Sequence, residues 1–472
     1  MRNIVIEDNF GLLQLDNPHF QDASGLIESY SNAKTVTPLS LQLNEILIHS
    51  GNIDPDILAQ IPDQRLQNQH HIKIGNAASP LPAQVLADSK LMDILRRQPS
   101  VLNPIVLSAE AAELAKELQA GMVMRTSSVN DVSQVYPTRD FLEENPPTVL
   151  NSKAAQVEIF AELDRQNGTN YIPESHVVRN NSELTDAVLR LLQQHRGVML
   201  KENLSTGGNG VTRFFKDYLE QIAIQIKTDV PEDTLSAFTK SQEITYGEKN
   251  PLVVQEFIPM VISNPSIEMF VPPPDGFNGR GPQAPWVTYA GDMIIQAHSY
   301  LGIRIPDPLL VNPQTKGIHE RQRRYCEAFE GLVSAALKIA KYYQEMGYVG
   351  IMDCDCGIAI NEREEIFGKI FESNLGRETG GTLPHLLLKK AGLGIKSAAI
   401  QVLNLQWGSD AEYSPKEVIQ RLNSHGYQSK RGGFIVTSVT PDYRLFSGIG
   451  IATTTKKTAQ LINEIVKTCK KI

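Results

Sequence analysis

The sequence lacks any hydrophobic run long enough to cross a membrane as a helix. No window of its 472 residues approaches the roughly eighteen uninterrupted apolar positions that a spanning helix needs. An excess of positive charge is also missing, because 53 Asp and Glu residues outnumber 45 Lys and Arg residues. The net charge of −8 argues against general binding to nucleic acid and gives no electrostatic reason to expect an anionic membrane. We therefore expect no nucleic-acid partner and no membrane partner.

Cysteine is scarce, with four residues in the whole chain. Cys354 and Cys356 alternate with two aspartates, which places them on the opposite face of a predicted strand. The expected role for both is that of small buried hydrophobic residues in a reducing compartment, in preference to a disulfide or metal role. The first residues begin as a strand, without the apolar segment of a signal peptide. Together these features predict a cytoplasmic protein.

Length and composition limit the fold before any motif is considered. With 41% hydrophobic and 21% charged residues, the composition is that of a soluble globular protein, and 472 residues exceed one ordinary core. Short apolar runs alternate with helical stretches, which is typical of an α/β fold. The proline pair at 146–147 marks one boundary, and a smaller α/β tail begins near residue 391. We predict domains over residues 1–148, 149–390 and 391–472.

Residues 271–286 are rich in proline and glycine. A stretch of this composition and length is expected to form a loop. Two roles stay open for it, a mobile flap over a functional site and a flexible surface insertion.

The strongest chemical signal is a predicted antiparallel hairpin. Two β-rich runs, residues 351–360 and 366–374, flank the short polar stretch 361–364. If Ile360 faces Glu365 across this loop of four residues, Asp353 lies directly opposite Glu372.

Strand alternation places Asp355 and Asn374 on the same face as that pair. Because two directly opposed carboxylates repel each other, the pattern favours a bound cation over a solvated hairpin face. Carboxylate and amide oxygens are ligands that Mg²⁺ takes beside nucleotide phosphates. The prediction depends on the register, since a slip of one residue would turn Asp353 to the opposite face.

A lysine followed by a glycine-rich loop is the second chemical signal. Lys201 ends a predicted strand, residues 205–210 contain three glycines, and a second predicted strand begins at Val211. A phosphate-binding P-loop and a dinucleotide fingerprint both need a helix after the glycines, so neither fits. A strand, a glycine loop and a strand instead describe a hairpin that folds over phosphates, with Lys201 as a fixed cation. Taken alone, the loop is equally compatible with an ordinary turn.

In the order of these parts, residues 150–385 resemble the ATP-grasp superfamily. Lys153, before a predicted helix, matches the upstream lysine of that family, and residues 253–258 match its adenine-side hinge strand. A first-turn surface lysine is the alternative for Lys153. The resemblance implies an ATP-grasp fold, α/β with an α+β core, flanked by an N-terminal α/β pre-ATP-grasp domain and a small C-terminal α/β domain. It also implies ATP and Mg²⁺ as cofactors, with Mn²⁺ as an alternative ion.

The resemblance assigns roles to individual residues. Metal ligands are expected at Asp353, Glu372 and Asn374, with Asp355 outside that set. Catalytic roles are expected for Lys201 and Arg377. The ribose contact is unassigned, with Ser263 and Glu268 as candidates. The residues implied to bind the nucleotide are Lys153, Lys201, Ser205, Thr206, Gly207, Gly208, Gly210, Gln255, Glu256, Phe257 and Ile258.

The function implied by this resemblance is that of an ATP-dependent ligase. Such a ligase joins a small-molecule or peptide carboxylate to an amine through an acyl phosphate, and a homodimer is compatible with it. The layout of the whole chain, with the glycine runs at 431–433 and 448–450, is most similar to the peptide-ligase branch that includes the pheganomycin ligase. Two alternatives stay open, a phosphotransferase of the same fold and a nucleotide-binding regulatory protein without turnover.

Overall fold

The structure is a computed structural model, and the statements below concern the residues it describes. None of the helices in these residues is both long and apolar enough to span a membrane. The described residues are 2–7, 45–49, 56, 60, 71–74, 80–97, 100–104, 107–122, 134–204, 210–228, 230–259, 261–277, 279–296, 299–306, 320–376, 380–391, 397–406, 412–424, 428–429, 432–439 and 445–470.

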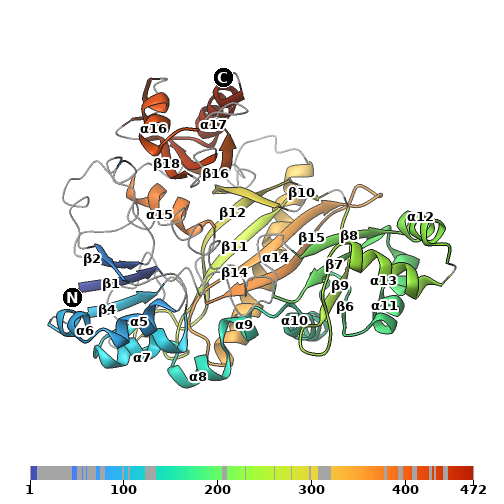
Figure 1. The fold of residues 1–472 in the computed structure, drawn as a ribbon, viewed down its shortest axis with the longest axis horizontal. Helices are drawn as coiled ribbons and strands as arrows, with labels where there is room; N and C mark the ends of the chain where they lie inside the picture. The colour runs from blue at the N-terminus through green and yellow to red at the C-terminus, as the bar shows by residue number, and fades with distance from the viewer. Residues whose placement is uncertain are drawn as a thin grey trace.

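A parallel sheet lies in the N-terminal part of the chain, at the left of Figure 1. Its described strands are β1 (Arg2–Glu7), β2 (Glu45–His49), β3 (His71–Lys73), β4 (Ser100–Pro104) and β5 (Gly121–Met122), in the order β3-β2-β1-β4-β5. Each neighbouring pair runs parallel, as the alternation of apolar and helical stretches predicts. The helices of this part are α5 (Leu81–Ala87), α6 (Ser89–Leu95), α7 (Ala109–Glu117), α8 (Arg139–Glu144) and α9 (Pro147–Leu150).

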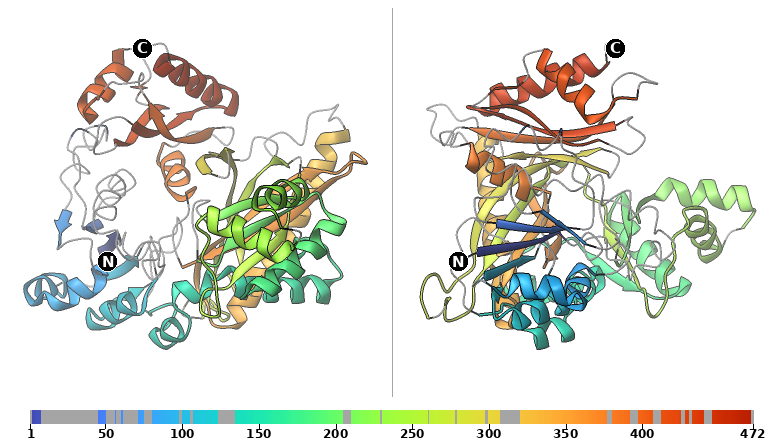
Figure 2. Two further views of the ribbon diagram at one scale, coloured as in Figure 1. Left: turned by 45° about the vertical axis from the view of Figure 1, so that its right-hand side comes forward. Right: turned by 60° about the vertical axis from the view of Figure 1, so that its left-hand side comes forward.

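A small antiparallel sheet and its helices form what we call the small-sheet unit, residues 175–256, at the right of Figure 1. In both views of Figure 2 this unit lies away from the C-terminal segment. Its strands, in sheet order, are β6 (Ser175–Val178), β9 (Leu252–Glu256), β7 (Gly197–Glu202) and β8 (Val211–Phe215). Its helices are α11 (Asn181–Gln194), α12 (Lys216–Ile226) and α13 (Pro231–Ser241).

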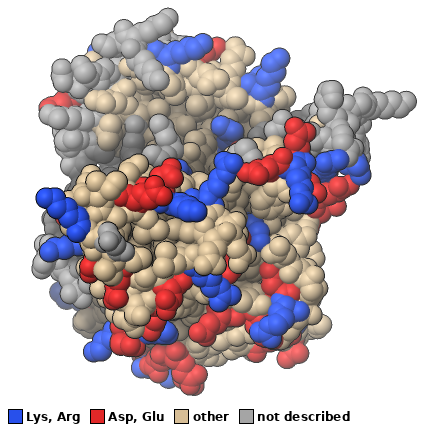
Figure 3. Space-filling view, turned by 90° about the vertical axis from the view of Figure 1, so that its right-hand side faces the viewer, with Lys and Arg blue, Asp and Glu red and all other residues tan. Residues whose placement is uncertain are grey.

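Strand alternation gives the small sheet one apolar and one functional face. Leu200 and Val254 belong to the apolar core under the helices, together with Phe214. Because neighbouring residues of a strand point to opposite faces, Lys201 and Val253 lie on the other face. Figure 3 shows the molecular surface seen from the right-hand side of Figure 1, where the small-sheet unit lies; Lys and Arg are interspersed there with Asp and Glu.

A large antiparallel sheet runs from the centre of the molecule to its C-terminal segment. The described order is β10-β14-β11-β12-β13-β16-β19-β18-β17, and β15 pairs with β14. The strands are β10 (Val261–Ser263), β11 (Pro265–Val271), β12 (Trp286–Gln296), β13 (Ser299–Ile305), β14 (Gly350–Ile360), β15 (Ile366–Leu375), β16 (Ala398–Gln406), β17 (Gln428–Ser429), β18 (Gly432–Val439) and β19 (Leu445–Ala452). Strand β13 precedes the predicted domain boundary at residue 391, and β16 follows it. Because these two strands pair, the large sheet continues across that boundary.

Helices cover this sheet and join it to the small-sheet unit. The long α14 (Glu320–Glu345) packs its apolar stripe against the large sheet, with Leu332, Ala336 and Ile339 in the central core. The remaining helices are α10 (Lys153–Asn167), α15 (Thr382–Lys390), α16 (Pro415–Ser424) and α17 (Thr455–Lys470). Of these, α10 contacts β6 and β9 on one side and β15 on the other, so it lies between the two sheets.

The proline- and glycine-rich loop is anchored on the side of α14. The Nε2 group of Gln344 donates to the carbonyl oxygens of Pro272 and Gln283, at 2.7 Å each. Phe277, in the middle of the loop, packs edge to face on Tyr136 with ring centroids 5.7 Å apart. These contacts favour a packed surface insertion over a mobile flap.

Candidate active site

The predicted hairpin forms, but the prediction of its register was wrong. Its two strands are joined by five residues, and Ile360 pairs with Ile366 in place of Glu365. The side chain of Asn361 causes the longer loop, because its Oδ1 accepts the N–H groups of Arg363 and Glu365, both at 2.9 Å.

A bulge at Phe371 adds a second shift of one residue, between the pairs Asp355–Glu372 and Cys356–Ile370. As a result Asp353 faces Asn374, and Asp355 faces Glu372. Two single shifts sum to an even number, so the acidic side chains keep the face that was predicted for them. Asp355, which the resemblance leaves outside the metal set, is the residue directly opposite Glu372.

The acidic face extends onto the neighbouring strand β11. Glu268 pairs with Asp353 across β11 and β14 and is buried. Its carboxylate accepts hydrogen bonds from Tyr289 Oη at 2.8 Å and Thr382 Oγ1 at 3.0 Å. Ser266 Oγ donates to Asp353 Oδ2 at 3.0 Å. Glu268 is thus a neighbour of the predicted metal ligands, and this position gives no support to its role as a ribose contact.

Ser263, the other ribose candidate, is held by neighbouring polar side chains. Its hydroxyl donates to Asp292 Oδ1 at 2.9 Å and lies 2.9 Å from Tyr325 Oη. Neither candidate lines the pocket between the two sheets, so the ribose contact stays unassigned.

The oxygen donors of this face fit a Mg²⁺ ion that is shared with phosphate. Within the described part of the chain, no three Asp, Glu, His or Cys side chains form a complete metal-binding group. Mg²⁺ is commonly held by one or two carboxylates together with substrate phosphates and water, so a closed cage of protein ligands is not required. Glu372 supplies donors of that kind, together with Asp353 and Asn374, which form the next residue pair on the same face.

Two lysines face these carboxylates. Lys153 is buried, and its Nζ lies 3.4 Å from Glu372 Oε2, so the alternative of a surface lysine was wrong. Lys201, on β7, is buried as well, with its Nζ 5.5 Å from the centre of the Phe371 ring. Burial lowers the pKa of Lys201 to about 8; the charge of Lys153 acts in the same direction, and those of Glu372 and Asp355 oppose it.

Both lysines line one narrow pocket between the small sheet, α10 and β15. The bulged Phe371 projects into it from β15, and Gln255 reaches it from β9. The full lining consists of Lys153, Gln156, Val157, Phe160, Ile172, Ser175, Lys201, Val253, Gln255 and Phe371. Sequence analysis found Lys153, Lys201 and Gln255 but gave no role to Phe371, which precedes the predicted metal ligand Glu372.

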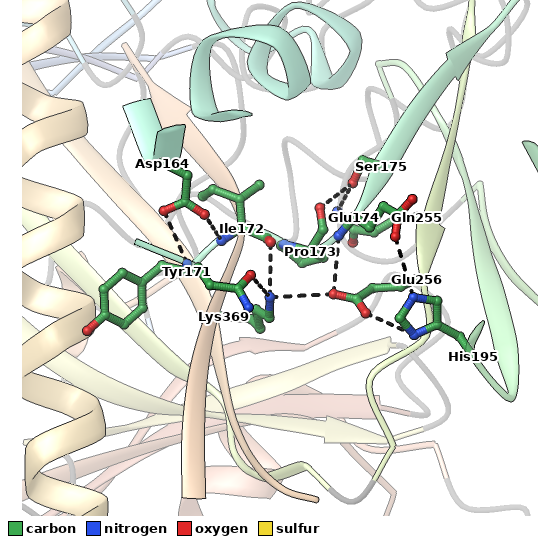
Figure 4. A network of polar contacts seen from close by, with 11 residues as sticks. Asp164, Tyr171, Ile172, Pro173, Glu174, Ser175, His195, Gln255, Glu256 and Lys369 are labelled. Atoms are coloured by element: carbon green, nitrogen blue, oxygen red, sulfur yellow. Dashed lines mark hydrogen bonds and ion pairs between the residues drawn. The ribbon is translucent and has the colours of Figure 1, made fainter. Parts of the chain in front are cut away.

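The hinge strand β9 sends its last side chains to two different sides. Gln255 lies in the pocket, where its Nε2 donates to Ser175 Oγ at 3.0 Å. Glu256 points away from it, and its carboxylate lies 3.5 Å from Lys369 Nζ and 3.1 Å from His195 Nδ1 (Figure 4). The Glu256 side chain therefore belongs to a polar network behind the hinge.

The backbone of the hinge is partly engaged as well. The N–H group of Glu256 donates to the carbonyl oxygen of Glu174 at 2.8 Å, and that of Phe257 donates to Gly197 at 3.0 Å. Both N–H groups are thus already bonded within the protein. The predicted contact with adenine can therefore involve only the carbonyl groups of this segment or the backbone of Ile258.

Some predicted site residues lie outside the described residues. These are Ser205, Thr206, Gly207, Gly208 and Arg377. The strands on either side of the glycine loop are described, and β7 pairs antiparallel with β8 from Lys201 and Val211 onward. The Glu202 N–H donates to the Gly210 carbonyl oxygen at 2.8 Å, which extends the pairing by one step toward the residues that connect the two strands. The two predicted strands and their pairing are confirmed, and the contact of the glycine-rich residues between them with phosphate stays a prediction.

Two buried amide side chains hold the strand that carries Glu372 and Asn374. Asn151 pairs with the backbone of Leu375, with its Nδ2 at 2.9 Å from the carbonyl oxygen and its Oδ1 at 2.8 Å from the N–H. Gln156 pairs in the same way with Ser373, at 2.8 and 3.0 Å. These side chains occupy the outer edge of β15 as a neighbouring strand would.

We expect Gln156→Leu to lower the free energy of unfolding by about 1–3 kcal/mol, because the N–H and C=O of Ser373 would lose their buried partner. Urea unfolding measures this loss. Gln166→Leu, on the exposed side of the same helix, serves as the matched control and should change stability by no more than about 0.5 kcal/mol. Equal losses in the two variants would contradict the role given to Gln156.

We expect ATP affinity to fall as pH rises through about 8, the pKa of the Lys201 ammonium. Because this pKa lies below the ordinary 10.5, the buried charge is unfavourable for folding below about pH 8, and that cost disappears as pH approaches 10.5. Between about pH 8 and pH 10.5 the positive charge of Lys201 and the affinity for ATP should therefore decline together, while loss of this charge does not destabilise the fold. Titration of ATP between about pH 7 and pH 9 tests this, and a flat profile in wild type would contradict it.

Comparison with known proteins finds no matching family model and no matching curated protein. Solved structures do match over the whole chain. N5-carboxyaminoimidazole synthase from Aspergillus clavatus, in complex with ADP and 5-aminoimidazole ribonucleotide, shares 10% identity at a TM-score of 0.50, covering 99% of this chain and 98% of that one. An N5-carboxyaminoimidazole ribonucleotide synthetase in complex with ADP shares 9% identity at a TM-score of 0.50, covering 100% and 97%.

At such low identity these matches show the fold and leave the reaction open. The fold agrees with the one predicted from the sequence, and the matches give no support to the predicted peptide-ligase branch. The part of the chain that the structure describes has the ATP-grasp fold.

Proposed function

We propose that this protein is an ATP- and Mg²⁺-dependent ligase that joins a carboxylate to an amine through an acyl phosphate. One observation carries the proposal: two buried lysines, Lys153 and Lys201, line one pocket, and Lys153 Nζ lies 3.4 Å from Glu372 Oε2 on the acidic face of β14 and β15. Ammonium groups opposite carboxylates suit a ligand that brings both phosphate and a cation. The ADP bound to the two structural neighbours is consistent with such a ligand.

In the proposed reaction a carboxylate oxygen attacks the γ-phosphorus of ATP, the bond to the β–γ bridging oxygen breaks, and ADP leaves. The amine nitrogen then attacks the acyl carbon, loses a proton and expels phosphate. Lys153 and Lys201 would neutralise the phosphates of ATP and hold them in place while the γ-phosphoryl group is transferred to the carboxylate. A Mg²⁺ ion on Asp353, Glu372 and Asn374 would supply Lewis acidity at the phosphate oxygens. Arg377 is proposed to stabilise charge on the acyl group.

The division into residues 1–148, 149–390 and 391–472 is part of the same proposal. The middle segment contains the small sheet, α10 and β15, which form the pocket, and the segments before and after it would provide the substrate side. An amino acid or peptide as substrate rests on the sequence resemblance alone.

Incubation with Mg-ATP and pools of amino acids, peptides and other small carboxylates and amines tests the proposal. ADP, phosphate and new masses are followed, with Lys201→Ala and Glu372→Ala as controls. A ligase gives an amide with ADP and phosphate, whereas a product one phosphate heavier than an input would favour the phosphotransferase. Binding of ATP without any turnover would favour the regulatory protein. Equal ADP formation by wild type and both variants would refute the site.

A further inference from the structure

Asn203 lies between Lys201 and the glycine loop, and it contacts the helix that carries Lys153. Its side chain is buried, and its Oδ1 accepts hydrogen bonds from Ser152 Oγ and from the Ala154 N–H, both at 2.9 Å. Its backbone carbonyl accepts the N–H of Lys153 at 3.3 Å. Asn203 therefore bonds residues on both sides of Lys153.

These bonds cap the start of α10 from a distant segment. The first N–H groups of a helix have no partner within the helix and need an acceptor. Ser152 supplies one from its own position, accepting the Ala155 N–H at 3.3 Å. Asn203, in the turn just after β7, accepts the N–H groups of Ala154 and Lys153. Lys153, the first residue of the helix, thus cannot shift along β7 unless these bonds break.

Such a fixed placement has an electrostatic reason. Lys153 and Lys201 carry like charges near each other, and the charge of Lys153 lowers the pKa of Lys201. Glu372 offsets part of this repulsion, and a scaffold must supply the rest of the restraint while no phosphate is bound. On the opposite side of α10, Asn151 and Gln156 fix β15, so the segment 151–156 is tied to both the lysine strand and the Glu372 strand.

We propose that Asn203 is a positioning residue for the nucleotide phosphates. It fixes the start of α10 to β7 and so holds Lys153 and Lys201 at the separation that a phosphate chain requires. This inference rests on the proposed function, since it takes the ligand of the two lysines to be the phosphates of ATP.

Nucleotide binding to the intact protein tests this role without knowledge of the other substrates. The affinities of a non-hydrolysable ATP analogue and of AMP are measured by calorimetry for wild type, Asn203→Leu and Asn203→Asp. Leu removes the acceptor at similar size, and we expect it to weaken binding of the ATP analogue by roughly tenfold while AMP binding stays unchanged. Asp keeps the acceptor oxygen, and we expect affinity within about threefold of wild type.

Asn180→Leu is the matched control, because Asn180 caps α11 with the same kind of bond, 2.9 Å to the Glu183 N–H, far from the lysines. It should leave both affinities unchanged. Unchanged binding of the ATP analogue by Asn203→Leu, parallel loss of AMP binding, or failure of Asp to restore affinity would each overturn the proposal. If Asn203→Leu does not fold, Asn203→Ser, which retracts the acceptor without adding apolar bulk, is judged by the same criteria. A wild-type protein that binds no ATP would overturn the proposed function, and this inference with it.

Discussion

Glu372→Gln is expected to lower the rate of Mg²⁺-dependent ATP turnover by roughly a hundredfold to a thousandfold. The amide keeps the size of the side chain but removes the negative charge that faces Lys153 Nζ at 3.4 Å and pairs across the hairpin with Asp355. A neutral donor cannot hold a Mg²⁺ ion with comparable strength, so charge on the transferred phosphoryl group would lose its main counter-charge. The rate of ADP release at saturating ATP measures the effect.

Glu364→Gln, in the exposed loop of the same hairpin, is the control for removal of a carboxylate and should keep the wild-type rate. Thermal unfolding of both variants shows that the hairpin is intact. Full turnover in a folded Glu372→Gln variant would remove Glu372 from the metal set.

Lys201→Met is expected to weaken ATP binding by roughly tenfold to a hundredfold, which is the range for a buried hydrogen bond to a charged group. Met keeps most of the side-chain length and its contact with the Phe371 ring, while the ammonium is lost. The same variant should show no fall of affinity near pH 8, because the group that titrates there is gone. Calorimetric titration at two pH values measures both effects.

Lys216→Met, exposed at the start of α12 in the same small-sheet unit, is the matched control and should bind ATP as wild type does. If Lys201→Met kept both its affinity and its pH dependence, the phosphates would have to bind elsewhere.

The hairpin shows how far sequence analysis reaches in this chain. Alternation of apolar and polar residues correctly predicted both strands and the shared face of the acidic residues. It did not predict which residues oppose each other, because that depends on the hydrogen bonds of Asn361 in the loop and on a bulge at Phe371. A bulge reverses the phase of a period-two pattern, but Phe371 follows the apolar Ile370, so the sequence does not show where the phase changes.

The contacts that assemble the pocket could not be predicted, because they join segments far apart in the chain. Asn203 reaches Ser152, and Gln156 reaches Ser373 across most of the central segment. A single buried asparagine or glutamine looks the same in sequence whether it caps a distant helix or lies in a turn. Glu268 was similarly considered for the ribose, and only the pairing of β11 with β14 places it beside Asp353.

The side chain of Glu256 was within reach of sequence reasoning. Leu252 and Val254 pack in the core of the small-sheet unit, and Glu256 shares their parity along β9. Parity therefore places its side chain on the opposite face from Gln255, which lines the pocket, and the structure shows the Glu256 carboxylate beside Lys369 and His195.

Calorimetric titration of ATP into the wild-type protein, with and without Mg²⁺, tests the central claim most directly when it is repeated with Glu372→Gln. The account predicts one ATP per chain, tighter binding of ATP by wild type when Mg²⁺ is present, and no such gain in the variant. Absence of ATP binding, or an equal gain from Mg²⁺ in Glu372→Gln, would contradict it.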